Sequence, residues 1–304
     1  MTKRDGLRGN GRIKLSKDDF SGLEDIVAFL QQRAQWHRWY FQYLTSKNFS
    51  KQLDSKTIWF TRSTDMNDRD EARRLLENKF YFCMSYGMSE NVAMWTTYGI
   101  PRKEAMRVSY DGKAFRDFVR KLTELKVVNS GGKELKDRIS KDDFDVSFHD
   151  VVYLNKSQTR FHYKGESYRL NKDDLRKLRT KYGDYFKKFG WQYEYETRVV
   201  ITLPKKKLSP DAYALTADFS KVQEVSSKLM GRMRKGCLTN PSFVVVGPWS
   251  GDAEKEEVLE MCRKIDNGAR YPDVQISDYY GELKPKSACD RCKKRNTCKC
   301  CEYR

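Results

Sequence analysis

The chain has 304 residues, of which 38% are hydrophobic and 13% aromatic, and its formal net charge is +18. This composition excludes a disordered chain and is enough for a hydrophobic core in one large or two modest domains. The charge favours a nucleic acid or another polyanion as partner, because a strongly basic protein attracts polyanions; the alternative is a soluble protein that is merely basic.

Neither a membrane-spanning segment nor an export signal is expected. No apolar run approaches the roughly 20 residues of a spanning helix. The N-terminal MTKRDGLRGNGRIK is basic but lacks the apolar stretch of a secretory signal. We therefore expect a cytoplasmic protein without membrane contact, whose cysteines are reduced. Residues 1–14 predict a flexible basic arm, ahead of an α+β domain over residues 15–280.

Helix and strand signals alternate through the first half of this domain. SGLE at residues 21–24 has the form of a capping box, in which Ser21 is the N-cap and Glu24 reaches back to it. The predicted helices cover 23–34, 46–54, 91–99 (a short helix or turn) and 113–126. The predicted strands cover 39–45, 57–62, 80–87 and 105–111.

Residues 160–189 interleave Lys and Arg with Phe and Tyr, and two interpretations stay open. Basic residues bind phosphates and aromatic faces stack on bases, which would make this segment a nucleic-acid surface. An amphipathic helix would instead bury the aromatic rings and leave the lysines in solvent.

The segment GWQYEYETRVVITL, residues 190–203, predicts a strand that carries two carboxylates. Alternate residues of a strand share a face, so Glu194, Glu196 and Arg198 project together, and Tyr193 and Tyr195 point the other way. Solvated charges are common on edge strands, but the apolar run that follows indicates a central strand. We therefore favour a cleft lined by these carboxylates.

Two kinds of chemistry could use such a pair. Carboxylates bind metal ions in nucleases, and an Asp at 65, 68 or 70 could supply a further ligand, whereas none of the three histidines has metal-site spacing. In glycosyl transfer, one carboxylate stabilises an oxocarbenium-like sugar and the other orients the acceptor.

The C-terminal part contains strand signals at 242–249 and 273–277 and a helix signal at 252–267. Strands and helices are interspersed along the whole chain without a regular βαβ period. This order predicts an α+β fold with a mixed central sheet and peripheral helices.

Five cysteines cluster in CDRCKKRNTCKCC, residues 289–301, within a basic tail over 281–304. The C-x₂-C pair followed by C-x-C-C gives enough thiolates for a tetrahedral structural zinc, as in a zinc knuckle. Cys289, Cys292 and Cys298 are the predicted ligands, with Cys301 or Cys300 as the fourth. The alternative, a disordered tail with incidental thiols, conflicts with the ready oxidation of clustered exposed thiols. The cysteines at 83, 237 and 262 have apolar neighbours and are predicted to be buried packing residues.

Several segments, taken in order, resemble an uncharacterised bacterial domain family of defence loci. They are WYFQYLTSKNFSKQL, TIWFTRSTDMNDRDE, FCMSYG with NVAMWTTYG, WQYEYETRVV and FVVVGPW, and they span roughly residues 39–270. The order of a strand with polar or aromatic residues, a middle strand with Ser and a late Glu-x-Glu is also similar, more loosely, to the ADP-ribosyltransferase superfamily. That superfamily includes toxins that modify nucleic acid.

The second resemblance implies a split, ADP-ribosyltransferase-like sheet with NAD as substrate. It implies that Glu196 is the catalytic glutamate, which hydrogen-bonds a hydroxyl of the nicotinamide ribose and stabilises the developing oxocarbenium. It further implies that Glu194 orients the acceptor.

The same resemblance implies the residues that bind NAD. Ser85 matches the middle-strand serine, and Tyr98 or Trp95 would stack on nicotinamide. Arg38, Tyr43 and the histidine at position 37 compete for the early motif, and the sequence does not decide among them.

The leading hypothesis is therefore an NAD-dependent ADP-ribosyltransferase that modifies RNA or DNA, as a toxin or phage-defence effector. A toxin implies a neutralising antitoxin protein, which the residues do not identify. The alternatives are a metal-dependent nuclease that uses Glu194, Glu196 and an Asp among residues 65–70, and a non-catalytic nucleic-acid-binding module.

Overall fold

A computed structural model describes residues 23–62, 78–86, 90–98, 104–155, 160–163, 166–171, 173–174, 176–177, 181–204, 208–219, 244–263 and 274–279. The predicted basic arm, Ser21 of the capping box and the cysteine-rich tail lie outside these ranges. No helix within these ranges is long and apolar enough to cross a membrane.

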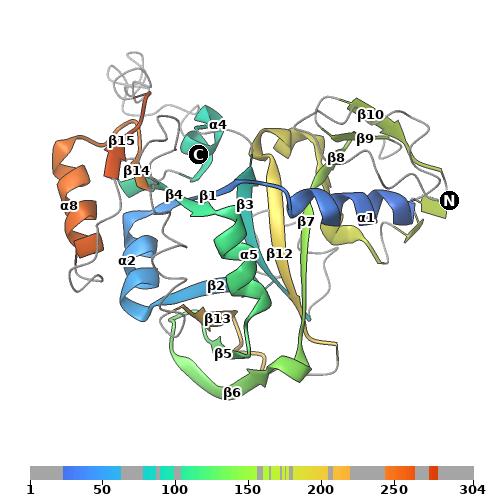
Figure 1. Cartoon of the computed structure of the whole chain (residues 1–304), viewed down its shortest axis with the longest axis horizontal. Coiled ribbons are helices and arrows are strands. Elements are labelled where there is room, and N and C mark those ends of the chain that lie inside the picture. Colours follow the sequence, from blue (N-terminus) through green and yellow to red (C-terminus); the bar gives the residue numbers. More distant parts are fainter. Residues whose placement is uncertain are drawn as a thin grey trace, which may run out of the picture.

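The described residues form a mixed sheet with helices packed around it, which confirms the predicted α+β class (Figure 1). The helices are α1 (Leu23–Ala34), α2 (Ser46–Ser55), α4 (Val92–Tyr98), α5 (Gly112–Arg120) and α8 (Asp252–Arg263). The large sheet contains β1 (Trp39–Thr45), β2 (Thr57–Arg62), β3 (Lys79–Tyr86), β4 (Ala105–Asp111), β5 (Glu124–Val128), β6 (Glu134–Ser140), β7 (Asp145–Asp150), β12 (Glu196–Thr202), β13 (Ala214–Asp218), β14 (Val244–Val246) and β15 (Val274–Ile276).

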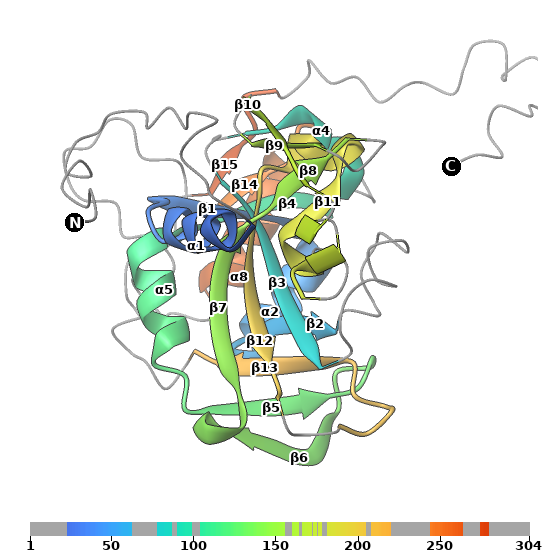
Figure 2. The same cartoon turned by 90° about the vertical axis from the view of Figure 1, so that its right-hand side faces the viewer.

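A second, smaller sheet lies beside the large one (Figures 1 and 2). It contains β8 (Val152–Leu154), β9 (Arg160–Tyr163), β10 (Glu166–Arg169) and β11 (Phe186–Lys188). Two short 3₁₀ helices, η4 (Gly183–Tyr185) and η5 (Phe189–Glu194), flank β11 along the chain. The hydrophobic core beneath α1 includes Val152, Leu154 and Phe186 from this small sheet, so α1 and the small sheet share a core.

The large sheet is split along one edge of β3. On its other edge, β3 pairs with the full length of β12, from Lys79 to Ser85. On the split edge, β1 pairs with Tyr86 and Ser85, whereas β2 pairs with Tyr81 and Phe80 at the far end. Between these pairings, β1 and β2 diverge, and the sheet forks over the middle of β3.

The main core lies on the α5 side of the forked sheet (Figure 2). Phe115 of α5 is fully buried and packs against the rings of Phe82, Tyr110 and Phe148, which belong to three different strands. A buried ring in contact with three strands fixes the positions of those strands relative to one another. β3 therefore has a rigid support behind the fork.

The N-terminus of α5 is fixed by a cap at Asp111, whose Oδ1 accepts a hydrogen bond of 2.8 Å from the backbone N–H of Ala114. We expect Asp111→Ala to lower the free energy of unfolding by about 1 kcal/mol, because that N–H loses its partner. Denaturant titration measures the change. Asp111→Asn keeps a side-chain acceptor and should stay close to wild type, and an equal loss in both variants would contradict the capping role.

Two sequence predictions of helix are wrong. The helix predicted over 113–126 ends at Arg120, and β5 begins at Glu124. Leu125 and Val127 alternate with polar residues, which is the period of a strand. The helix prediction instead extended the helical spacing of the preceding apolar residues through this segment. Within residues 160–189, an amphipathic helix over the whole segment is also wrong, because residues 173–174 and 176–177 are helical whereas other described parts form β9, β10, η4 and β11.

Candidate active site

The predicted strand over residues 190–203 is wrong in its first half. Residues up to Glu194 belong to η5, and β12 begins only at Glu196. Between them, Tyr195 adopts a left-handed conformation with φ 45°, which costs a residue other than glycine roughly 1–2 kcal/mol. This turn places Glu194 beside Glu196, so the two carboxylates meet through a turn and not through strand alternation. Tyr193 and Tyr195 are half-buried.

Glu196 is held by a fully buried guanidinium. Arg198 Nε donates to Glu196 Oε1 at 2.7 Å, and Arg198 Nη2 donates to Oε2 at 3.2 Å. Arg198 Nη1 also donates to the backbone carbonyl of Asp184 at 2.9 Å. Bidentate pairs of this kind fix the plane of the carboxylate as well as its charge. Arg198 is thus a positioning residue for Glu196.

Lys187, from β11, lies between the two carboxylates. Its Nζ donates to Glu194 Oε2 at 2.6 Å and to Glu196 Oε2 at 3.2 Å. On the other side of Glu194, the hydroxyl of Tyr98 donates to Oε1 at 2.5 Å. All three charged side chains are at least nine-tenths buried, so their interactions are screened little by solvent.

Burial and the neighbouring charges together give the two carboxylates different proton affinities. Desolvation, followed by the nearby charge of Glu196, raises the pKa of Glu194 to about 7. Burial also opposes ionisation of Glu196, but Arg198 and Lys187 outweigh it and hold the pKa of Glu196 well below its ordinary value. At neutral pH, Glu196 is therefore ionised while Glu194 is near its midpoint, as is typical of paired carboxylates with separate roles.

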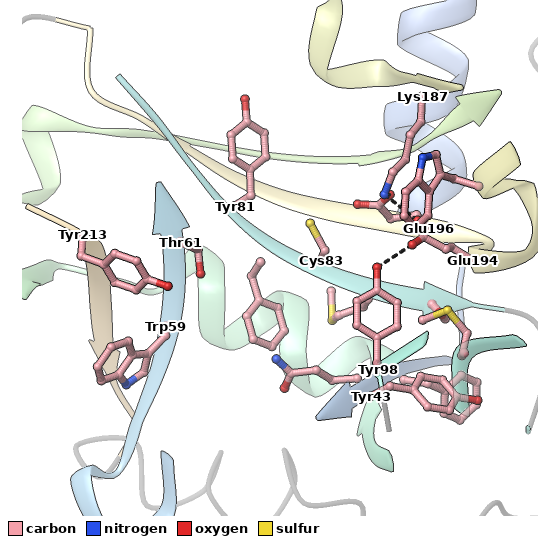
Figure 3. Close-up of a pocket in the computed structure, with 17 residues that line it drawn as sticks. Tyr43, Trp59, Thr61, Tyr81, Cys83, Tyr98, Lys187, Glu194, Glu196 and Tyr213 are labelled. Atoms are coloured by element: carbon pink, nitrogen blue, oxygen red, sulfur yellow. Dashed lines mark hydrogen bonds and ion pairs between the residues drawn. The ribbon is translucent and has the colours of Figure 1, made fainter. Parts of the chain in front are cut away.

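These side chains line a cavity of about 300 Å³ at the fork of the sheet (Figure 3). Its floor is formed by residues of β3, including Tyr81, Cys83 and Ser85. Cys83 therefore borders the cavity and does not serve only in packing as predicted, whereas Cys262 is fully buried as predicted. Burial, followed by the neighbouring charge of Glu196, raises the pKa of the Cys83 thiol well above its ordinary value.

The cavity brings together several of the predicted NAD-binding residues. Tyr43, Ser85 and Tyr98 line it together with Glu194 and Glu196. Ser85 is buried, and its hydroxyl has no hydrogen-bond partner among the residues that the structure describes. A buried hydroxyl without a partner beside a cavity is available to a ligand.

Two other predicted residues do not line the cavity. Trp95 is fully buried, and its Nε1 donates to Glu90 Oε2 at 3.0 Å, so its ring packs in the core and does not face a ligand. Arg38 lies before β1, where its carbonyl accepts from Gly112. Its competitor His37 is paired with Asp150 at 2.7 Å and stacked on Tyr86. Of the candidates for the early motif, only Tyr43 borders the cavity.

Lys187, Trp59 and Tyr213 also border the cavity, although no sequence pattern predicted them as site residues. Lys187 belongs to the basic segment 160–189, whose composition indicated anion binding but did not distinguish one lysine from its neighbours. Trp59 and Tyr213 lie in segments typical of ordinary strands. No local signal marks these residues, because β2 and β13 bring them together only in the folded sheet.

Both metal predictions depend on residues beyond the described ranges. Within those ranges, no group of three or more His, Cys, Asp or Glu side chains is arranged to hold a metal ion. The aspartates at 65, 68 and 70 and the four tail ligands Cys289, Cys292, Cys298 and Cys301 lie outside them. A zinc site in the tail stays a prediction, which metal analysis of the purified protein tests.

Comparison with known proteins gave a distant structural likeness. No protein-family model matches the chain, and no curated protein matches it. The chain is similar to Thermus sp. 2.9 DarT in complex with NAD⁺, at 10% identity and a TM-score of 0.34, over 81% of this chain and 98% of that one. It is also similar to the same protein with carba-NAD⁺ (11% identity, TM-score 0.33, 81% and 98% covered) and with ADP-ribosylated ssDNA (10%, 0.33, 80% and 96%). These values do not assign the chain to a family, so membership in the defence-locus family stays a prediction.

Proposed function

We propose that the protein is an NAD-dependent ADP-ribosyltransferase that modifies a nucleic acid. The observation that carries this proposal is the pair of carboxylates at the cavity, of which Glu196 is kept ionised and Glu194 has a pKa of about 7. Glycosyl transfer needs one carboxylate to stabilise positive charge on a sugar and a second to accept a proton.

In the first step, the bond between the nicotinamide nitrogen and ribose C1′ breaks, and its electron pair leaves with nicotinamide. Glu196 stabilises the positive charge that develops on the ribose. Lys187 and Arg198 supply three hydrogen bonds to this carboxylate, which can accept about four. A ribose hydroxyl can donate to the remaining position.

In the second step, a nucleophilic atom of the acceptor base attacks C1′ and its proton passes to Glu194. The Tyr98 hydroxyl and the Lys187 ammonium hold Glu194 in place from two sides. The net charge of +18 favours a polyanionic acceptor. The Ser85 hydroxyl, which has no hydrogen-bond partner among the described residues, can bind the carboxamide of nicotinamide.

One incubation tests the reaction. The protein is mixed with NAD labelled in its adenylate part and with DNA and RNA, with and without a chelator. Label on the nucleic acid together with free nicotinamide supports the proposal. Cleavage of the nucleic acid that the chelator blocks would instead indicate a nuclease, and binding without either product would indicate a non-catalytic module.

A role as a toxin or defence effector, with an antitoxin protein as partner, rests on the sequence resemblance. It is tested in cells by induced expression. Wild-type protein should arrest growth, whereas Glu196→Gln at equal abundance should not. Growth arrest by both proteins would show that toxicity does not depend on ADP-ribose transfer.

A further inference from the structure

The cavity has a second end that the two reaction steps do not use. Trp59 on β2 and Tyr213, just before β13, line this end with Thr61, whereas Lys187 and the carboxylates lie at the other (Figure 3). Both aromatic side chains are half-buried, so part of each ring is available to a ligand.

The register of β3 sets the separation of the two ends. Ser85 pairs with Glu196 at the catalytic end, and Tyr81 pairs with Thr61 at the aromatic end. Four residues of an extended strand span about 13 Å, at roughly 3.3 Å per residue. A ligand that reaches both ends must therefore be long and must carry two recognisable groups.

The aromatic end is already organised without a ligand. Trp59 Nε1 donates to Thr57 Oγ1 at 3.0 Å, which fixes the orientation of the indole. The ring also packs against Gly132, where an added Cβ would lie 3.1 Å from Trp59 Cη2. The backbone of Tyr213 is held by hydrogen bonds to Val128 and Arg62. Rings that are held in place lose little entropy when they stack on a ligand.

We propose that Trp59 and Tyr213 form a subsite that stacks on the adenine of NAD. This inference rests on the proposed function, because it requires the reactive ribose of the same molecule to lie at Glu196. The donor, and not the acceptor, is the occupant: Glu194, the proposed acceptor carboxylate, lies at the catalytic end, and the β3 floor connects the two ends in one cavity. The diphosphate would cross the floor between them.

The test compares two donors that share the reactive bond. Nicotinamide mononucleotide has the nicotinamide–ribose bond of NAD but lacks adenosine. We expect Trp59→Leu to raise the KM for NAD by about 5- to 150-fold, which corresponds to the loss of roughly 1–3 kcal/mol of base stacking. Cleavage of the mononucleotide should be unchanged. Trp59→Phe keeps an aromatic ring, so its KM for NAD should lie between those of wild type and Trp59→Leu.

A matched control is Trp36→Leu, because Trp36 is another partly exposed tryptophan, 43% accessible, and does not line the cavity. This variant should leave the KM for NAD and the cleavage of the mononucleotide unchanged. An equal loss for NAD and the mononucleotide in Trp59→Leu, or no loss for either, would overturn the adenine subsite.

Binding of AMP, measured by calorimetry, gives a second readout that does not depend on turnover. Wild type and Glu196→Gln should bind AMP alike, and Trp59→Leu should bind it 5- to 150-fold more weakly. AMP binding that Trp59→Leu does not weaken would overturn the subsite even if NAD is consumed. AMP binding that depends on Trp59, in a protein that never consumes NAD, would overturn the proposed function and leave the base subsite standing.

Discussion

Replacing Glu196 by Gln should lower the rate of ADP-ribose transfer about 10³-fold. Gln has nearly the same volume, and its carbonyl can still accept a hydrogen bond from Arg198 Nε. It carries no charge, so the positive ribose loses its main electrostatic stabilisation, and the loss of such a preorganised group costs about 10²–10³-fold or more. Initial rates with labelled NAD and nucleic acid measure the effect.

The same substitution also affects stability, and the assay must separate the two effects. Arg198 is fully buried, and removing the charge of its partner leaves a buried cation poorly compensated, which costs about 3–5 kcal/mol in such pairs. A destabilised control is Thr197→Val, which removes the 2.7 Å hydrogen bond that Thr197 donates to Asp150 and leaves Glu194 and Glu196 unchanged. Rates are compared well below both unfolding midpoints. If Glu196→Gln transfers ADP-ribose as fast as Thr197→Val does, Glu196 has no catalytic role.

The elements that could be predicted from the sequence are those whose signal is local. The apolar face of α1, from Leu23 to Ala34, repeats at helical spacing and is buried as predicted. The aromatic segment of β1 and the apolar half of β12 are strands as predicted, because each has a local run of aromatic or apolar residues. The choice of Glu194 and Glu196 as a pair also came from their spacing, and the structure places both at the cavity.

The geometry that joins the pair could not be predicted in this way. Strand alternation would have placed Glu194 and Glu196 on one face, but the left-handed Tyr195 does so by a turn, and tyrosine gives no sequence signal for positive φ. Lys187 reaches both carboxylates because β11 pairs with β8 in the small sheet, a contact between segments that are distant in the sequence. Such long-range pairings leave no periodic pattern in either segment.

Replacing Glu194 by Gln should separate the two steps of the reaction. Transfer to nucleic acid should fall by about 10²–10⁴-fold, the usual contribution of a general base. Cleavage of NAD to ADP-ribose and nicotinamide should persist, because Glu196 and its Arg198 partner are unchanged. Released nicotinamide and label on the nucleic acid, measured in one reaction, give both rates. An equal fall in both would contradict a role confined to the acceptor.

The pH dependence of transfer tests the same assignment. A base must be ionised to accept a proton, and the pKa of Glu194 is raised to about 7. Below that pH, two cations, Lys187 and Arg198, face the single anion Glu196; above it, a second anion balances them and favours a positively charged ribose. The transfer rate of wild type should therefore rise through about pH 7. Glu194→Gln should lose this rise.

Stability should change with pH in the opposite direction to activity. The pKa of Glu194 is higher in the folded state than the ordinary value of 4.5, so the folded state binds this proton more tightly than the unfolded state does. Its contribution to stability is fully present below about pH 4.5 and is lost as the pH rises through about 7. Denaturant titrations from pH 5 to 8 should show a decline in wild type that is smaller in Glu194→Gln. Because burial beside Glu196 causes both effects, a rise in transfer without this decline would place the base elsewhere.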